Sequence, residues 1–91
     1  MDMIITVIGL GLIGGSLCKA IKNRTENVCY GVNRSRGALD AALADGAIDE
    51  AFSTEQIPAS DLYIICLHPQ ATIDFIRQHA SDFRPDSLVI D

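Results

Sequence analysis

The feature that most constrains the fold is a glycine-rich turn that follows an apolar run near the N-terminus. The run Ile4–Ile8 consists of β-branched residues, and Gly9, Gly11 and Gly14 come next with the spacing G-x-G-x-x-G. In a strand-to-helix turn the first glycine permits a tight reversal, the second lets the backbone approach a pyrophosphate, and the third lets the helix lie close to the strand. The helix N-terminus then presents unpaired N–H groups to the anion. The pattern predicts a dinucleotide site; the alternative is a turn with a structural role only.

Strand-like and helical patterns alternate along the rest of the chain. Ser35 is expected to cap the second helix, and Gly46 to end it. The alternation predicts an α/β fold of the Rossmann type: an open parallel sheet with strand order 3-2-1-4-5 and helices on both faces, truncated after the fifth strand. The expected strands are residues 4–8, 28–32, 51–53, 61–67 and 87–91; the expected helices are residues 12–24, 36–45 and 69–83, and residues 55–60 could hold a single helical turn.

Each expected helix has an apolar side that should pack against the sheet. His79 falls on the polar side of the third helix, beside Arg77 and Gln78, so we expect it to be solvated. The side chains expected to face the sheet are Ile13, Leu17, Ala20 and Ile21 in the first helix, Ala38, Leu39, Ala42 and Leu43 in the second, and Ile73, Ile76, Ala80 and Phe83 in the third.

Length and charge narrow the range of functions. The 91 residues allow one domain, residues 1–91, and no added substrate domain, so we expect a fragment of a longer enzyme. A net charge of −5 with 7 basic residues gives no positive field for a polyanion, and nucleic acid is not an expected partner. No apolar run is long enough to span a bilayer, and the N-terminus lacks the features of a signal peptide, so no membrane partner is expected.

The cysteines indicate a reducing compartment. Cys18, Cys29 and Cys66 are odd in number, widely spaced and set in apolar stretches. We expect reduced, buried thiols of a cytoplasmic protein. The alternative, a reactive cysteine, has no neighbouring group that would lower a thiol pKa. The sequence assembles no metal-ligand cluster and no Ser/His/Asp set, so it assigns neither a metal site nor a catalytic residue.

The ligand crevice is expected where the strand order reverses, between the carboxyl ends of the first and fourth strands. Residues Gly9 to Gly14 would line one side, and Cys66, Leu67 and His68 the other, near the nicotinamide half of a cofactor. His68 could also act as an acid or base. Because it lies between a strand and a proline, the favoured interpretation is a loop histidine that is hydrogen-bonded to backbone.

The residues after the second strand predict the preferred cofactor. Asn33 stands where an NAD-specific site usually has Asp or Glu. Asn33 can bond a ribose hydroxyl, Arg34 offers a planar set of donors to a phosphate, and Ser35 adds a hydroxyl and an N–H near a helix start. The alternative is that Arg34 stacks on the adenine or points to solvent. The motif therefore predicts NADP preferred over NAD.

Four segments resemble the nucleotide-binding domain of prephenate and arogenate dehydrogenases: Gly9-Leu10-Gly11-Leu12-Ile13-Gly14-Gly15-Ser16-Leu17, Gly31-Val32-Asn33-Arg34-Ser35, Gly46-Ala47-Ile48-Asp49-Glu50 and residues 61–67. The resemblance covers essentially the whole chain. It implies a homodimeric parent enzyme that oxidatively decarboxylates prephenate or arogenate with a nicotinamide cofactor.

The resemblance also implies roles for particular residues. The phosphate turn would consist of Gly9, Leu10, Gly11, Leu12, Ile13 and Gly14, and Thr72 would lie close to the cofactor. One departure is His68, which takes the place of a proline, with Pro69 following it. The catalytic histidine and the substrate-binding arginine of that family lie in segments beyond Asp91, so no turnover is expected from these 91 residues.

Two other functions remain open. β-Hydroxyacid dehydrogenases and imine reductases have N-terminal domains of this type and also use Asn-Arg-Ser/Thr after the second strand. The segment Gly46-Ala47-Ile48-Asp49-Glu50 favours the prephenate and arogenate enzymes. A non-enzymatic nucleotide-sensing or interaction module is the third possibility.

Overall fold

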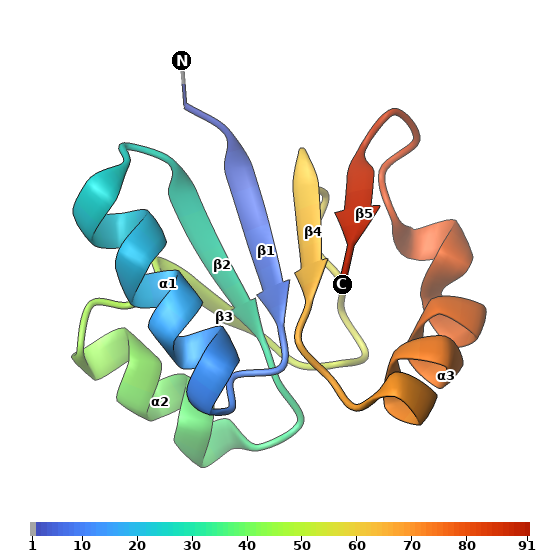
Figure 1. Cartoon of the computed structure of the whole chain (residues 1–91), viewed down its shortest axis with the longest axis horizontal. Coiled ribbons are helices and arrows are strands. Elements are labelled where there is room, and N and C mark those ends of the chain that lie inside the picture. The colour runs from blue at the N-terminus through green and yellow to red at the C-terminus, as the bar shows by residue number, and fades with distance from the viewer. Residues whose placement is uncertain (1) are drawn as a thin grey trace.

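A computed structural model describes residues 2–91 and shows a parallel five-stranded sheet with the order β3-β2-β1-β4-β5 (Figure 1). This confirms the predicted fold class and strand order. The elements in chain order are β1 (Ile4–Ile8), α1 (Leu12–Arg24), β2 (Val28–Val32), α2 (Arg36–Ala44), β3 (Glu50–Phe52), β4 (Leu62–Ile65), α3 (Pro69–His79), the 3₁₀ helix η1 (Ala80–Asp82) and β5 (Leu88–Ile90).

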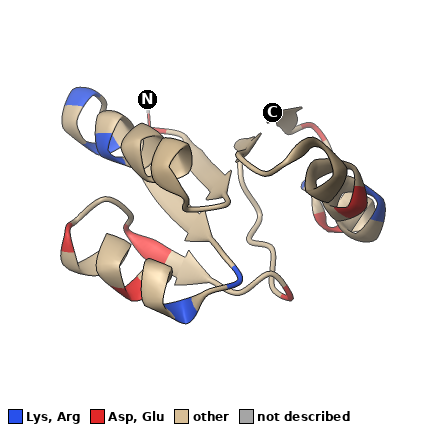
Figure 2. Ribbon diagram, turned by 60° about the horizontal axis from the view of Figure 1, so that its bottom comes forward, with Lys and Arg blue, Asp and Glu red and all other residues tan. Residues whose placement is uncertain are grey.

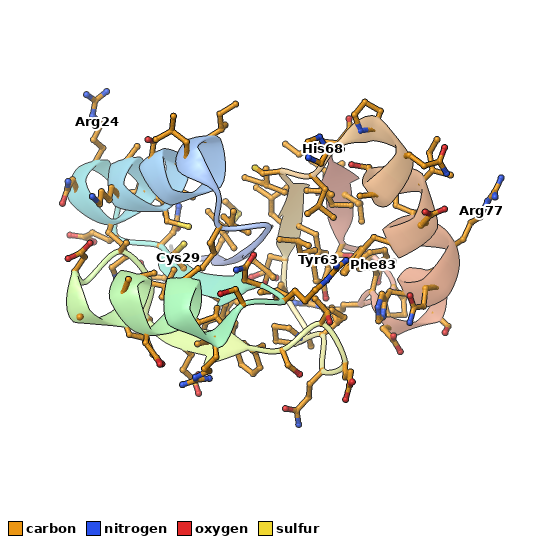
Figure 3. All side chains as sticks on the ribbon, turned by 90° about the horizontal axis from the view of Figure 1, so that it is seen from below. Arg24, Cys29, Tyr63, His68, Arg77 and Phe83 are labelled. Carbon is orange, nitrogen blue, oxygen red and sulfur yellow. The ribbon has the colours of Figure 1, made fainter. Side chains whose placement is uncertain are left out.

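The two faces of the sheet carry separate apolar clusters. Val7 on β1 belongs to the cluster under α1 and α2, whereas its neighbour Ile8 belongs to the cluster under α3. This follows from the alternation of side chains along a strand. Seen from the carboxyl ends of the strands, α1 and α2 lie on one side of the sheet and α3 on the other (Figure 3). Burial of both faces explains the continuous apolar runs of the central strands.

Element boundaries match the sequence-based expectation in the first half of the chain, whereas β3 lies one residue earlier than expected, β4 covers Leu62–Ile65 rather than residues 61–67, and β5 is one residue shorter at each end. The first two strands and α1 begin and end where predicted, and α2 ends one residue early, at Ala44. The Ser35 hydroxyl accepts a hydrogen bond from the backbone N–H of Ala38 over 3.5 Å, as expected of an N-cap. Gly46 has φ +71°, a conformation that favours glycine at the end of a helix.

The expected buried side of α3 was wrong by one residue. Ile73 and Ile76 are 45% and 39% exposed, while Thr72, Phe75 and His79 are buried. The aromatic ring of Phe75 fills the core, and the His79 ring packs on it with a centroid distance of 4.5 Å. His79 is therefore not a solvated residue. Helix α3 also ends at His79 rather than at residue 83, and Ala80 in η1 is exposed.

Two further side chains expected against the sheet are exposed instead. Ile13 is 78% exposed, because α1 turns the small residue Gly14 toward the sheet and its buried line continues through Cys18 and Ile21. Leu43 at the end of α2 is 37% exposed.

The segment between β3 and β4 has a tight turn at residues 53–56, in which the backbone N–H of Gln56 donates to the carbonyl oxygen of Ser53 over 3.1 Å, and no helix at residues 55–60. The hydroxyl of Tyr63 donates to the carbonyl oxygen of Pro58 over 2.8 Å and accepts from the backbone N–H of Ser60 over 2.9 Å. These bonds fix residues 58–60 beside Tyr63, and the helical turn that the sequence allowed does not form. Within residues 2–91, no helix has the length and apolar character required to cross a bilayer.

Candidate functional site

A cavity of about 560 Å³ opens at the carboxyl edge of the sheet. Its walls come from the ends of β1, β2 and β4, the loop after β3, and one side of α3. Of the residues singled out in the sequence, the cavity brings together Gly9, Asn33, Arg34, Ser35 and Leu67. The strand order reverses at this edge, where ligands of open α/β sheets bind.

Two glycines of the turn are required by the protein itself. Gly9 has φ +95°, and a Cβ there would lie 2.6 Å from the carbonyl oxygen of Cys66. A Cβ on Gly14 would overlap the carbonyl oxygen of Gly9. The first glycine thus permits the reversal after β1, and the third permits the close approach of α1, as the motif predicted.

Gly11 differs, because nothing in the protein requires a glycine there. It has an ordinary φ of −73°, and a Cβ at this position would meet no atom within 4 Å. Gly11 is also the N-cap of α1, where no side chain caps the helix and no acidic residue lies in the first turn. The N–H groups of Leu12, Ile13 and Gly14 therefore have no partner within the helix, and the open surface beside Gly11 leaves room for an anion.

Asn33 connects the turn to the loop after β2. Its Oδ1 accepts from the backbone N–H of Leu10 over 3.1 Å, and its Nδ2 donates to the carbonyl oxygen of Ser35 over 3.3 Å. An amide has four hydrogen-bonding positions, so one acceptor and one donor position remain for a ligand. Asn33 therefore holds the geometry of the turn in addition to any contact with ribose.

The arginines that flank Ser35 differ in their surroundings. The Nε of Arg36 lies 2.9 Å from Asp40 Oδ1, an ion pair along α2. Arg34 is exposed, lines the cavity and has no ion-pair partner in the part of the chain that the structure describes. Arg34 is thus the arginine of this loop that can receive an anion in the cavity.

The predicted site residues that follow β4 differ in burial and in their contacts. Cys66 lies under the glycine turn, and it is half-buried rather than buried as expected. The His68 side chain is exposed at the start of α3 (Figure 3), and within residues 2–91 it makes no hydrogen bond to backbone, contrary to the favoured interpretation. Thr72 is buried, and its hydroxyl donates to the carbonyl oxygen of Leu67 over 3.3 Å. Thr72 therefore fixes the β4–α3 turn, which places Leu67 in the cavity wall.

Nine of the fourteen residues that line the cavity were not predicted from the sequence. Two of them end β1 and β2, and the others come from the loop after β3 and from the side of α3 whose orientation differs by one residue from the expected one. Placing Phe75 rather than Ile76 against the sheet would have revealed the α3 contribution. The lining residues that were not predicted are Ile8, Val32, Thr54, Glu55, Ala71, Asp74, Phe75, Gln78 and His79.

The sheet order, the glycine turn and the cavity at the switch point define a class, the Rossmann-type nucleotide-binding domain. The chain belongs to the family described as NADP oxidoreductase, coenzyme F420-dependent, whose model matches residues 4–91. No curated protein sequence matches the chain.

Solved structures with the same fold include three proteins of different description. A prephenate dehydrogenase from A. aeolicus, in complex with hydroxyphenyl propionate and NAD+, has a TM-score of 0.88 at 19% identity, over 98% of this chain and 32% of that one. An arogenate dehydrogenase from Synechocystis has a TM-score of 0.87 at 26% identity, and the match covers 96% of this chain and 31% of that one. TarJ from S. aureus, in complex with NADPH, has a TM-score of 0.78 at 16% identity, and the match covers 99% of this chain and 30% of that one. The chain thus spans about a third of each.

Proposed function

We propose that this chain is the dinucleotide-binding domain of a prephenate or arogenate dehydrogenase. The observation that carries the proposal is the uncapped N-terminus of α1 beside Gly11, where the protein leaves open the space that a Cβ would fill. A glycine with no conformational or packing reason of its own fits a turn that approaches a pyrophosphate.

The rest of the edge fits the two halves of a dinucleotide. The adenosine half would occupy the cavity, whose volume of about 560 Å³ is ample for a nucleoside. The pyrophosphate would lie over the free N–H groups of Leu12, Ile13 and Gly14, and the nicotinamide half would extend toward Cys66 and His68. When bound, the nicotinamide supplies the hydride chemistry, and the protein supplies binding and orientation.

The substrate assignment depends on the sequence resemblance and on two structural neighbours, the prephenate and arogenate dehydrogenases. Because the chain spans about a third of those enzymes, we place the acid–base and substrate-binding groups in further segments of a homodimeric, cytoplasmic parent enzyme. The 91 residues alone should bind the cofactor without reducing it. Steady-state assays with prephenate or arogenate test this, and turnover by the chain alone would contradict the placement of catalysis elsewhere.

We further propose that NADP binds more tightly than NAD, through Arg34. A charge-assisted bond between its guanidinium and a 2′-phosphate is worth roughly 1.5–3 kcal/mol, or about ten- to a hundredfold in affinity. Calorimetric titration of the chain with NADP+ and NAD+ tests the preference. Equal affinities, or tighter binding of NAD+, would contradict it.

A pair of variants isolates the contribution of Arg34. Arg34→Ala should remove most of the difference between the cofactors. Arg77→Ala removes the same charge from a side chain that points away from the cavity on α3 (Figure 3), so it should leave the difference intact. If both variants lose the preference equally, net charge rather than a contact with Arg34 would explain it.

A further inference from the structure

Opposite charges line the cavity from neighbouring loops. Arg34 follows β2, and Glu55 lies in the loop after β3; both side chains are exposed and both line the cavity. Figure 2 shows a basic segment at the end of β2 and an acidic segment in the β3–β4 loop at the same edge of the sheet. The parallel pairing of β2 with β3 explains why the two loops emerge together.

The other ionisable side chains of the cavity are already engaged. Asp74 Oδ1 accepts from Gln70 Nε2 over 3.0 Å, and His79 Nδ1 lies 2.9 Å from Asp82 Oδ2. Glu55, by contrast, has no ion pair or side-chain hydrogen bond with residues 2–91; its backbone N–H alone is held, by Ser53 Oγ over 3.4 Å. Its carboxylate is therefore free to meet a ligand in the same cavity as the Arg34 guanidinium.

We propose that Glu55 is a second determinant of cofactor choice, which favours NAD and opposes the preference that Arg34 creates. The proposal rests on the proposed dinucleotide site. A carboxylate accepts hydrogen bonds from ribose hydroxyls and repels a 2′-phosphate, the role usually played by an acidic residue at the end of the second strand. Here Asn33 occupies that position, and Glu55 brings the missing carboxylate to the cavity from the next loop along the sheet.

This arrangement predicts effects of opposite sign on the two cofactors. Glu55→Gln keeps the size of the side chain and removes its charge, so NADP+ should bind about three- to tenfold more tightly. NAD+ should bind about two- to fivefold more weakly, because a bond from ribose to a charged acceptor becomes one to a neutral acceptor. The gain for NADP+ should shrink as salt is raised, since exposed charges are screened.

Glu26→Gln is the matched control. Glu26 is exposed in the loop before β2, at the opposite end of that strand from the cavity, and the substitution makes the same change in net charge. Calorimetric titration of the wild-type chain and both variants with NADP+ and NAD+ gives all six affinities. Circular dichroism checks that the variants retain the fold.

The outcomes separate the two proposals. Opposite shifts with Glu55→Gln and none with Glu26→Gln support a specificity role for Glu55. If the wild-type chain binds a dinucleotide and the two variants give the same NADP+/NAD+ ratio, the role of Glu55 is wrong while the site stands. If the wild-type chain binds neither dinucleotide, the proposed function itself is overturned, and the role of Glu55 with it.

Discussion

The side-chain oxygen of Asn33 lies 3.1 Å from the backbone nitrogen of Leu10 and accepts its hydrogen bond. Leu10 is the second residue of the glycine turn, and the same amide donates to the carbonyl oxygen of Ser35. One side chain thus ties the turn that would hold the pyrophosphate to the loop that would read the ribose. A substitution of Asn33 should affect both.

Replacing Asn33 with Asp should shift cofactor choice toward NAD. The carboxylate can still accept from Leu10, so the turn should persist, but the new negative charge would repel a 2′-phosphate and weaken NADP+ binding by about tenfold or more. Asn33→Ala removes the hydrogen bond to Leu10 and should weaken the binding of both cofactors. Calorimetry on the two variants distinguishes recognition from positioning. Unchanged NADP+ affinity in Asn33→Asp would show that the 2′-phosphate does not approach this residue.

Gly11 and Gly14 should respond differently to added side chains. Gly11→Val meets open space in the protein, so the fold should persist while dinucleotide affinity falls by about tenfold or more, equivalent to roughly 1.4 kcal/mol. Gly14→Ala forces a Cβ onto the carbonyl oxygen of Gly9 and should destabilise the fold by about 2 kcal/mol or more. Urea unfolding and calorimetry measure the two effects. Normal affinity in a folded Gly11→Val chain would assign that glycine a structural role only.

Asp49 should make stability depend on pH in acid. Although burial opposes it, hydrogen bonds from Lys22 Nζ and from the backbone N–H of Cys29 lower the pKa of the Asp49 carboxyl from 3.8. A lowered pKa in the folded state gives stability that is present above pH 3.8 and lost as pH falls through the folded value.

Because Asp49 is more than a third exposed, solvent screening limits this contribution to about 1 kcal/mol. Asp49→Asn should therefore destabilise the chain by about 1 kcal/mol at pH 6 and by less at pH 3. Urea titrations at the two pH values test the difference. An equal loss of stability at both pH values would indicate that the charge of Asp49 does not contribute to stability.

Cys66 should be the first thiol to react with an alkylating reagent. Cys18 and Cys29 are fully buried, whereas Cys66 is half-buried under the glycine turn. Burial still raises the pKa of the Cys66 thiol, so its reaction should be slow at neutral pH and faster in alkali.

Bound NADP+ should slow the labelling of Cys66, by about tenfold at a concentration ten times the Kd. Mass spectrometry after timed alkylation identifies the thiol, and Cys66→Ser should abolish the fastest phase. Alkylation of Cys18 before Cys66, or an alkylation rate of Cys66 that does not change when NADP+ is bound, would contradict the placement of Cys66 beside the site.

The order of strands and helices could be predicted because each element is favoured by residues within it or directly beside it. The β-branched run of β1, the cap at Ser35 and the glycine at position 46 act over a few residues. The buried side of α3 could not be predicted in this way. Two sets of residues, offset by one, both fit helical spacing. The observed set includes His79, whose ring is buried with its Nδ1 hydrogen-bonded to Asp82 Oδ2, a contact that helical spacing does not show.

The candidate site was predictable where it follows the glycine turn and β2, and not where it depends on tertiary contacts. Arg34 and Leu67 reach the cavity as expected from the order of the strands. Glu55 does so because the hydroxyl of Tyr63, a residue eight positions later, helps to fix the path of the β3–β4 segment. No spacing within the sequence shows that contact.

The separate clusters on the two faces of the sheet have a consequence for cooperativity. Helix α1 and helix α3 pack on different clusters, which are joined through the central strands. Local opening of α3 can therefore occur with α1 still docked, and amide exchange in the two helices can differ. A dinucleotide lying across the strand ends would contact α1 with its phosphates and α3 with its adenosine half. The ligand would then act as a clamp between two layers, and the two helices would open as one unit.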